Sequence, residues 1–256
     1  MGIMLKNKKP INVYWSFFSD NEQEQDWSFL YPKPKTLFSN LVEKRDDIKS
    51  PDSYFSCPAV SNKTKKILVF NAPCDSSYRY KKINDEYIIE PISENWINAS
   101  FVRKQALKDM PTINFSLGYV LFADEDLSVY FTSPYFSEPK YTTYGLPVPG
   151  EFNIGSWYRT YNLELQVWNS SGEIHIKEGE PLFYAEFKTD RPINFHRNNY
   201  NQTLDKYQKA NILSKNIFGN FETLEKKYER FKQVGFKEKI LTEIKKNLID
   251  EVPYRF

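Results

Sequence analysis

The stretch from residue 147 to residue 190 constrains the fold most, because it holds three strand-like runs separated by two turns. In the first run, 161–168, apolar and polar side chains alternate, which places the apolar set on one buried face. Two further runs, 174–176 and 182–187, follow turns that are rich in Asn, Ser, Gly and Pro. We expect a three-stranded antiparallel meander whose buried face is covered by a second sheet.

Other strand-like runs occur on the N-terminal side of this stretch. Alternation, or continuous β-branched and aromatic residues, predicts strands at 11–18, 53–60, 66–71 and 87–92. Residues 112–132 predict a hairpin, because two alternating runs flank an acidic turn. The predicted fold class is mainly β: an antiparallel β-sandwich or jelly roll, with a β-clip topology as the alternative.

Two parts of the chain show helical spacing instead. Residues 36–47 predict a short helix with Leu37, Phe38 and Leu41 facing inward. After residue 198, apolar residues recur at intervals of three and four, with Lys and Glu on the opposite side. These intervals predict amphipathic helices at the C-terminal end of the chain.

The length of 256 residues allows one large β domain with a substantial core, or two smaller domains. We assign residues 1–197 to a β-rich domain, with its core at about 50–197. We expect residues 198–256 to form a C-terminal helical segment packed on that domain. Aromatic residues make up 17% of the chain, which favours strands and also favours contact surfaces.

Charge and hydropathy exclude several partner classes. The chain has 35 basic and 33 acidic residues and a formal net charge of +2, so we expect no general attraction to nucleic acid. No run approaches the roughly 18 apolar residues of a membrane span. The N-terminus lacks the apolar region of a secretory signal, and Lys6 stands where a myristoylation motif needs Ser or Thr. Cys57 and Cys74 are expected as free thiols in a reducing compartment, although their spacing permits a bridge across a hairpin.

Motifs of catalysis and metal binding are scarce. His175 and His196 are the only histidines, and Lys177 stands where a two-His-one-carboxylate iron site needs Asp or Glu. The sequence has no Gly-x-Ser-x-Gly elbow, no Walker A loop and no Gly-x-Gly-x-x-Gly. We therefore expect no metal and no cofactor, and we favour a non-enzymatic protein over an enzyme.

Ligand-binding candidates concentrate where a Pro-rich connection meets the first strand of the 147–190 stretch. Arg159 could stack on its aromatic neighbours, pair with a carboxylate such as Glu151 or Glu180, or bind a ligand anion. In the alternative, purely structural interpretation, Trp157 plugs the open end of the sandwich and Arg159 makes an internal ion pair. The full set of candidates is Trp157, Tyr158, Arg159, His175, His196 and Arg197.

Three segments carry a resemblance that covers nearly the whole chain. They read FNAPCDSSYRY at 70–80, PGEFNIGSWYRTYNLELQVW at 149–168 and EGEPLFYAEFKTD at 178–190. Together they resemble an uncharacterised family of large tailed phages of marine cyanobacteria. The resemblance implies a phage-encoded protein, and it transfers no activity and no catalytic residue.

A second, local resemblance concerns Tyr158-Arg159, the alternating strand after it, Asn169 and the run Ile-x-Ile-x-x-Gly at 174–179. This pattern is similar to the C-terminal half of the dUTPase and dCTP deaminase fold. In that family an Asp before the Tyr-Arg pair binds the deoxyribose, whereas residues 153–157 here contain no Asp. The resemblance thus implies a β-clip or jelly-roll topology and adds little support for nucleotide hydrolysis.

These observations leave two functions open. The first is a non-enzymatic phage-encoded protein, either a virion component or a host-interaction factor, whose partner is a virion or host protein. Its location would be the host cytoplasm or the virion. The second is a nucleotide- or sugar-binding protein or enzyme, whose Tyr-rich loops stack on the ligand while Arg159 or Arg197 holds an anionic group. The oligomeric state stays open.

Overall fold

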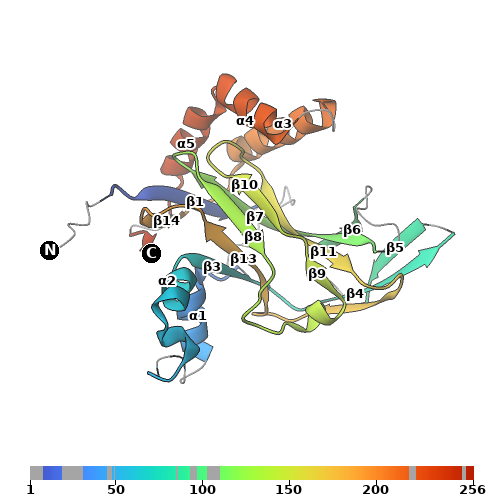
Figure 1. Cartoon of the computed structure of the whole chain (residues 1–256). Helices are drawn as coiled ribbons and strands as arrows, with labels where there is room; N and C mark the ends of the chain where they lie inside the picture. Colours follow the sequence, from blue (N-terminus) through green and yellow to red (C-terminus); the bar gives the residue numbers. More distant parts are fainter. Residues whose placement is uncertain are drawn as a thin grey trace.

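Alternation of inward and outward side chains builds two sheets that pack face to face, with helices on both outer faces (Figure 1). The computed structural model describes residues 8–18, 31–44, 48, 50–84, 86–92, 97–102, 110–218, 223–249 and 252–256, without the side chains of 213–218. The expected mainly-β sandwich with a C-terminal helical segment is confirmed. The first seven residues, which bear on the predicted lack of a targeting signal, lie outside the described part.

The seven-stranded sheet has the order β15-β14-β1-β7-β11-β9, and β6 also pairs with β7. Its strands are β1 (Ile11–Phe17), β6 (Asn98–Phe101), β7 (Thr112–Ala123), β9 (Gly145–Pro147), β11 (Thr160–Val167), β14 (Ile193–Arg197) and β15 (Tyr254–Arg255). The five-stranded sheet has the order β10-β8-β13-β3-β2. Its strands are β2 (Lys35–Thr36), β3 (Ile67–Asn71), β8 (Ser128–Thr132), β10 (Gly150–Asn153) and β13 (Pro181–Phe187). A three-stranded sheet of order β12-β4-β5 completes the β structure, with β4 (Ser76–Ile83), β5 (Glu86–Pro91) and β12 (Gly172–Ile176).

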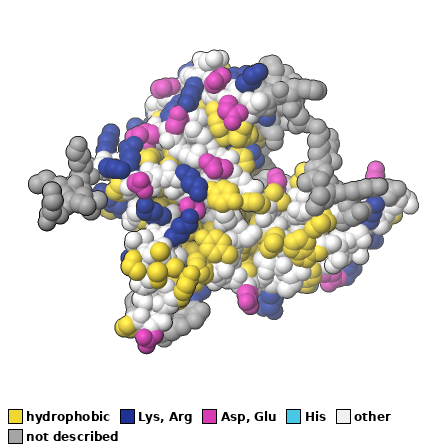
Figure 2. All heavy atoms as spheres, in the orientation of Figure 1, with side chains coloured by type: hydrophobic (Ala, Val, Ile, Leu, Met, Phe, Trp, Pro, Cys, Tyr) yellow, Lys and Arg dark blue, Asp and Glu magenta, His cyan; other side chains and the backbone are white. Residues whose placement is uncertain are grey.

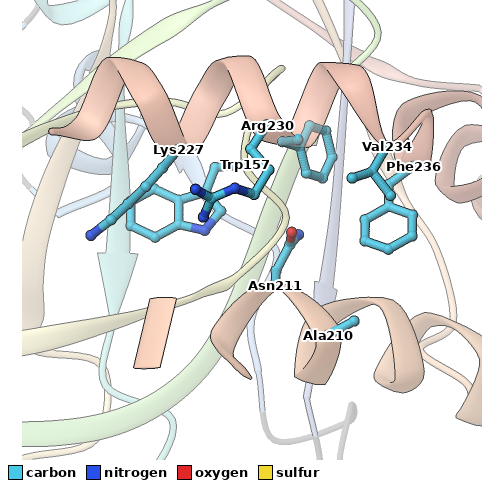
Figure 3. Close-up of a pocket in the computed structure, with 8 residues that line it drawn as sticks. Trp157, Ala210, Asn211, Lys227, Arg230, Val234 and Phe236 are labelled. Atoms are coloured by element: carbon cyan, nitrogen blue, oxygen red, sulfur yellow. The ribbon is translucent and has the colours of Figure 1, made fainter. Parts of the chain in front are cut away.

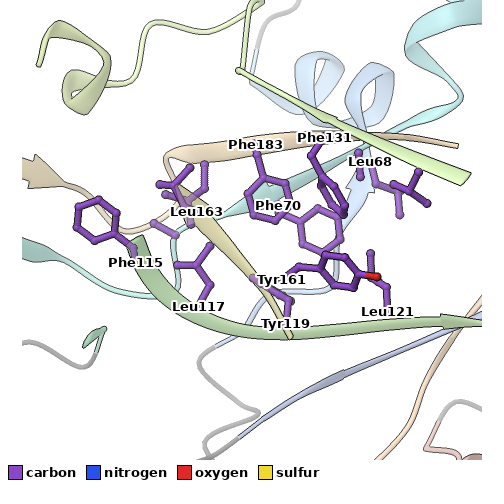
Figure 4. Close-up of a cluster of buried hydrophobic side chains, with 14 of the residues drawn as sticks. Leu68, Phe70, Phe115, Leu117, Tyr119, Leu121, Phe131, Tyr161, Leu163 and Phe183 are labelled. Carbon is purple, nitrogen blue, oxygen red and sulfur yellow. The ribbon is translucent and has the colours of Figure 1, made fainter. Parts of the chain in front are cut away.

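The main core lies between the seven-stranded and five-stranded sheets (Figure 4). Strand β7 contributes Phe115, Leu117 and Tyr119, which occupy alternate positions on its inner face. Strand β3 faces them with Leu68 and Phe70. Rings of this size bury a large apolar area, so aromatic residues contribute strongly to this core.

The strands β3 and β13 are apolar on both faces because each lies between two layers. Their inward residues join the main core, whereas Ile67, Val69 and Tyr184 point outward. These outward residues pack on Leu37 and Leu41 of α1 (Leu37–Lys44), as expected for the short N-terminal helix. The neighbouring helix α2 (Pro58–Thr64) and two 3-10 turns, η3 (Tyr54–Ser56) and η4 (Lys140–Thr143), complete the connections.

The C-terminal helices cover the outer face of the seven-stranded sheet (Figure 1). On the sheet, Tyr14, Val120 and Phe122 occupy the outward positions between the core residues of β1 and β7. The helices are α3 (Gln202–Phe218), α4 (Leu224–Gln233) and α5 (Phe236–Lys246). They contribute the buried residues Leu204, Phe231, Ile240 and Ile244. The helical spacing of apolar residues in the sequence therefore corresponds to the helix faces that pack on the sheet.

The predicted meander is wrong. Its three strands are all present, as β11, β12 and β13, but each belongs to a different sheet. Strand β11 pairs with β7 and β9, β12 pairs with β4, and β13 lies between β8 and β3. The two short turns therefore carry the chain from layer to layer and do not form hairpins.

Two other local predictions are also corrected. Strands β7 and β8 do not form the predicted hairpin at 112–132, because the turn after β7 passes the chain to the opposite sheet. The predicted strand at 53–60 is a 3-10 turn followed by α2. Pro58 occupies the first position of that helix, where its missing N–H and fixed φ are well tolerated.

The sheet also departs from a purely antiparallel arrangement. Strand β1 pairs with β14 in parallel, with Val13 opposite Phe195. The chain then leaves the sheet for the three helices and returns to it, since β15 pairs with β14. Residues 198–256 are thus helical for most of their length and end as an edge strand.

Cys57 is exposed and Cys74 is half-buried, and both are free thiols. Among the described helices, none has both the length and the apolar character needed to cross a membrane.

Candidate functional site

The segment between β10 and β11 positions the predicted ligand-binding residues. Its turn is held by the Asn153 side chain, whose Oδ1 accepts hydrogen bonds from the backbone N–H groups of Leu127 and Gly155. Gly155 is required here, because an added Cβ would lie 1.8 Å from the carbonyl oxygen of Glu125. The Ser156 hydroxyl donates to Asp126 at 2.6 Å, which ties the turn to the loop after β7.

The carboxylate of Asp126 also binds the C-terminal helices. Its Oδ2 lies 2.6 Å from Nζ of Lys232 on α4. Burial acts to raise the pKa of Asp126, but the hydrogen bonds from Lys232 and Ser156 outweigh burial and hold this pKa below its ordinary value. The charged form of Asp126 thus links the β10–β11 turn to α4.

Trp157 and Arg159 form the centre of an aromatic group on this segment. The Arg159 guanidinium lies 4.8 Å from the ring centroid of Trp157, 5.3 Å from that of Phe152 and 5.8 Å from that of Tyr161. Trp157 is 7% exposed and also contacts the ring of Tyr228 on α4 edge to face, at 6.1 Å. The predicted stacking of Arg159 on aromatic rings is confirmed.

The predicted internal ion pair of Arg159 is wrong. Its Nε donates to the carbonyl oxygen of Thr160 at 2.9 Å. Among the residues that the structure describes, no carboxylate lies within 4.0 Å of the guanidinium. Glu180, one predicted partner, instead accepts from the backbone N–H groups of Lys140 and Lys177. Within the described structure, the Arg159 guanidinium is stabilised by contacts with three aromatic ring faces.

Tyr158 plays a different role from its two neighbours. Its ring is 1% exposed and meets Phe122 edge to face at 5.3 Å, in the cluster between the sheet and the helices. Its carbonyl oxygen accepts from Nδ2 of Asn211 on α3 at 3.0 Å. Tyr158 therefore anchors the segment to the helices and offers no surface to a ligand.

A cavity of about 200 Å³, the helical cleft, opens on the far side of Trp157 (Figure 3). It lies between α3 and α4, with Trp157 from the sandwich at one side. Its lining residues are Trp157, Ala210, Asn211, Lys227, Arg230, Phe231, Val234 and Phe236. The cleft thus combines an aromatic and apolar lining with two basic side chains from α4.

A second cavity of about 140 Å³, the arginine cavity, lies on the Arg159 side. Arg159 and Tyr161 line it together with Phe131, Phe152 and Phe183. Residues 147–150 also line it. The Tyr161 ring is 3% exposed, and its hydroxyl is buried without a hydrogen-bond partner in the described part of the chain. The segment 157–161 therefore lines two cavities of different character.

The other predicted candidates lie elsewhere. His175 on β12 accepts or donates a hydrogen bond with the Ser77 hydroxyl at 2.9 Å, on the three-stranded sheet. His196 on β14 stacks on Tyr14 with centroids 5.2 Å apart, and Arg197 lies over Trp15 at 5.1 Å. Neither cavity is lined by any of these three candidates.

The described residues contain no set of metal ligands, since no three His, Cys, Asp or Glu side chains among them are grouped closely enough to hold an ion. The sequence prediction missed Lys227, Arg230 and Asn211, which line the helical cleft. Lys227 and Arg230 are three positions apart, a spacing that puts both on one helix face and could have marked them.

Comparisons with protein-family models, with curated proteins and with solved structures find no match for this chain.

Proposed function

We propose that this chain is a phage-encoded, non-enzymatic protein that binds another protein through the helical cleft. The observation that carries the proposal is the composition of the cleft, where the Trp157 ring meets apolar residues of α4 beside Lys227 and Arg230. Trp and Arg dominate the binding energy of protein interfaces, and they do so in partly enclosed pockets of this kind. The resemblance of three segments to a phage family supports the viral part of the proposal.

The chemistry of the cleft specifies the kind of partner. Val234 is 49% exposed at its edge and offers apolar surface outside the cavity. The two basic side chains favour a negatively charged segment, because complementary charge at a rim speeds association. On the face shown in Figure 2, hydrophobic side chains also gather below the C-terminal helices, with Lys and Arg beside them. We therefore assign an acidic segment with apolar side chains, contributed by a virion or host protein, as the occupant.

A crosslinking experiment tests this assignment. A photoreactive phenylalanine replaces Val234 at the edge of the cleft, and in a matched control it replaces Ile83, an exposed residue at the end of β4. Both variants are produced during phage infection, and crosslinked peptides are identified by mass spectrometry. We expect one dominant partner peptide, acidic and partly apolar, from the Val234 variant only. Mass spectrometry of purified virions then decides between a virion component and a host-interaction factor.

Crosslinking of the same partners from both positions, or of basic peptides from Val234, would overturn the assignment. In the first case the cleft would be no more reactive than an ordinary exposed surface, and in the second the partner would not be acidic.

The same cleft also favours a second candidate, a nucleotide-binding protein. The specific observation is an aromatic ring beside two cations, which suits a stacked base and a phosphate group. Titration with nucleoside monophosphates, followed by tryptophan fluorescence in wild-type protein and in Lys227→Ala, tests it. Equal fluorescence changes in the two proteins would exclude this candidate.

A further inference from the structure

The arginine cavity holds more hydrogen-bonding capacity than the described chain uses. A guanidinium has five N–H donors, and only Nε of Arg159 has a protein acceptor within the described residues, the Thr160 carbonyl oxygen. The rings of Phe152, Trp157 and Tyr161 compensate the charge through their faces, but they accept no conventional hydrogen bonds. The two terminal nitrogens of Arg159 thus form a fork with the geometry that a carboxylate matches.

Tyr161, which also lines this cavity, carries a second unused donor in its hydroxyl group. The Tyr161 side chain lines the cavity, and its hydroxyl is buried beside it with no described group that accepts its proton. A buried hydroxyl without a partner costs free energy comparable to a lost hydrogen bond. Native proteins keep few such groups. If this position served only to fill the core, Phe would fill it as well as Tyr. A ligand acceptor between Arg159 and Tyr161 would satisfy both residues.

The size and walls of the cavity limit what this ligand can be. Its volume of about 140 Å³ is close to the roughly 150 Å³ of an apolar cavity that binds benzene. Phe131, Phe152 and Phe183 give it aromatic walls. Among the described residues that line it, the one carboxylate is Glu164, which is exposed and lies outside ion-pair distance of Arg159. A body of about one aromatic ring with a single negative group matches these walls.

We propose that the arginine cavity binds a small monocarboxylate with an aromatic or short aliphatic body, held by the Arg159 fork and the Tyr161 hydroxyl. This site is separate from the helical cleft, so it does not depend on the proposed protein partner. Arg159 supplies charge and planar geometry, Tyr161 supplies a single directed donor, and the phenylalanine rings cover the apolar body.

Calorimetric titration with benzoate and with its neutral isostere benzamide tests the proposal. Wild-type protein should bind benzoate at least about tenfold more tightly than benzamide, because only benzoate pairs with the charged fork. Arg159→Gln should weaken benzoate binding by at least about tenfold. The matched control is Arg79→Gln, which removes an exposed arginine on β4 and should leave benzoate binding unchanged.

Tyr161→Phe separates ligand binding from structure, since it leaves the cation–π contacts of Arg159 in place. It should leave the Tm of the unliganded protein unchanged or raised, because it removes an unsatisfied buried hydroxyl. Its benzoate affinity should nevertheless fall by about threefold to tenfold. Equal binding of benzoate and benzamide, no benzoate binding, or full benzoate affinity in Tyr161→Phe would each overturn the proposal.

Discussion

Replacing Phe231 by Ala measures how strongly the C-terminal helices pack on the sandwich. Phe231 on α4 is 3% exposed and lies 6.0 Å from the ring of Phe122 on β7 and 6.3 Å from that of Phe236. Truncation of a buried Phe costs about 3–5 kcal/mol. Because Phe231 also borders the helical cleft, the new void joins an existing cavity, and we expect the lower end, about 3 kcal/mol. For a chain of this length that loss lowers Tm by about 6–12 °C.

Urea unfolding followed by far-UV circular dichroism gives this free energy. Phe231→Leu is the conservative control, because it keeps a large apolar side chain, and it should cost less than Phe231→Ala. Val234→Ala, at the exposed edge of the same helix, should change stability by about 0.5 kcal/mol or less. A loss below about 1 kcal/mol for Phe231→Ala would refute the packing of α4 on β7.

The turn that leads into β11 makes three further substitutions informative. Gly155→Ala should lower stability by about 1–3 kcal/mol or more, because its Cβ meets the Glu125 carbonyl oxygen, and an unchanged Tm would contradict this close approach. Trp157→Ala should cost about 3 kcal/mol in urea unfolding, and a cost near zero would show that the ring is not packed. Asp126→Asn should lower the unfolding free energy by less than about 1 kcal/mol near neutral pH. Because the folded pKa of Asp126 is lowered, its stabilisation is present above the ordinary pKa and is lost as pH falls through the folded value. The difference between the two proteins should therefore disappear in acid, and a difference that grows on acidification would contradict the ion pair with Lys232.

Side-chain periodicity predicts individual strands here but not their partners. Alternation in β7 and β11 identified both strands and their buried faces, because side chains on a strand alternate whatever the strand pairs with. The inference of a meander added the assumption that consecutive strands pair. The apolar run of β13 already argued against it, since a strand that is apolar on both faces needs a layer on each side.

The candidate site was predictable only in its local part. Arg159 follows two aromatic residues and stacks on one of them, as the sequence indicates. The cavities depend on residues far away along the chain. Trp157 meets Tyr228 and Arg230 only because α4 packs on the sheet. No residue spacing in the sequence specifies where α4 packs. The unused hydroxyl of Tyr161 is likewise a property of its surroundings, and its residue type alone predicts only a strand position.

The most direct test of the proposed function is the crosslinking yield from Val234 after charge reversal in the cleft. The double variant Lys227→Glu/Arg230→Glu reverses the charge of both basic side chains that line the cleft. The control Lys239→Glu/Lys245→Glu makes the same charge change at exposed positions of α5. We predict that the partner crosslink falls at least about tenfold with the first pair, as expected for a loss of about 1.4 kcal/mol or more, and persists with the second. A crosslink that survives reversal in the cleft, or that is lost equally with both pairs, would contradict recognition of an acidic partner by this site.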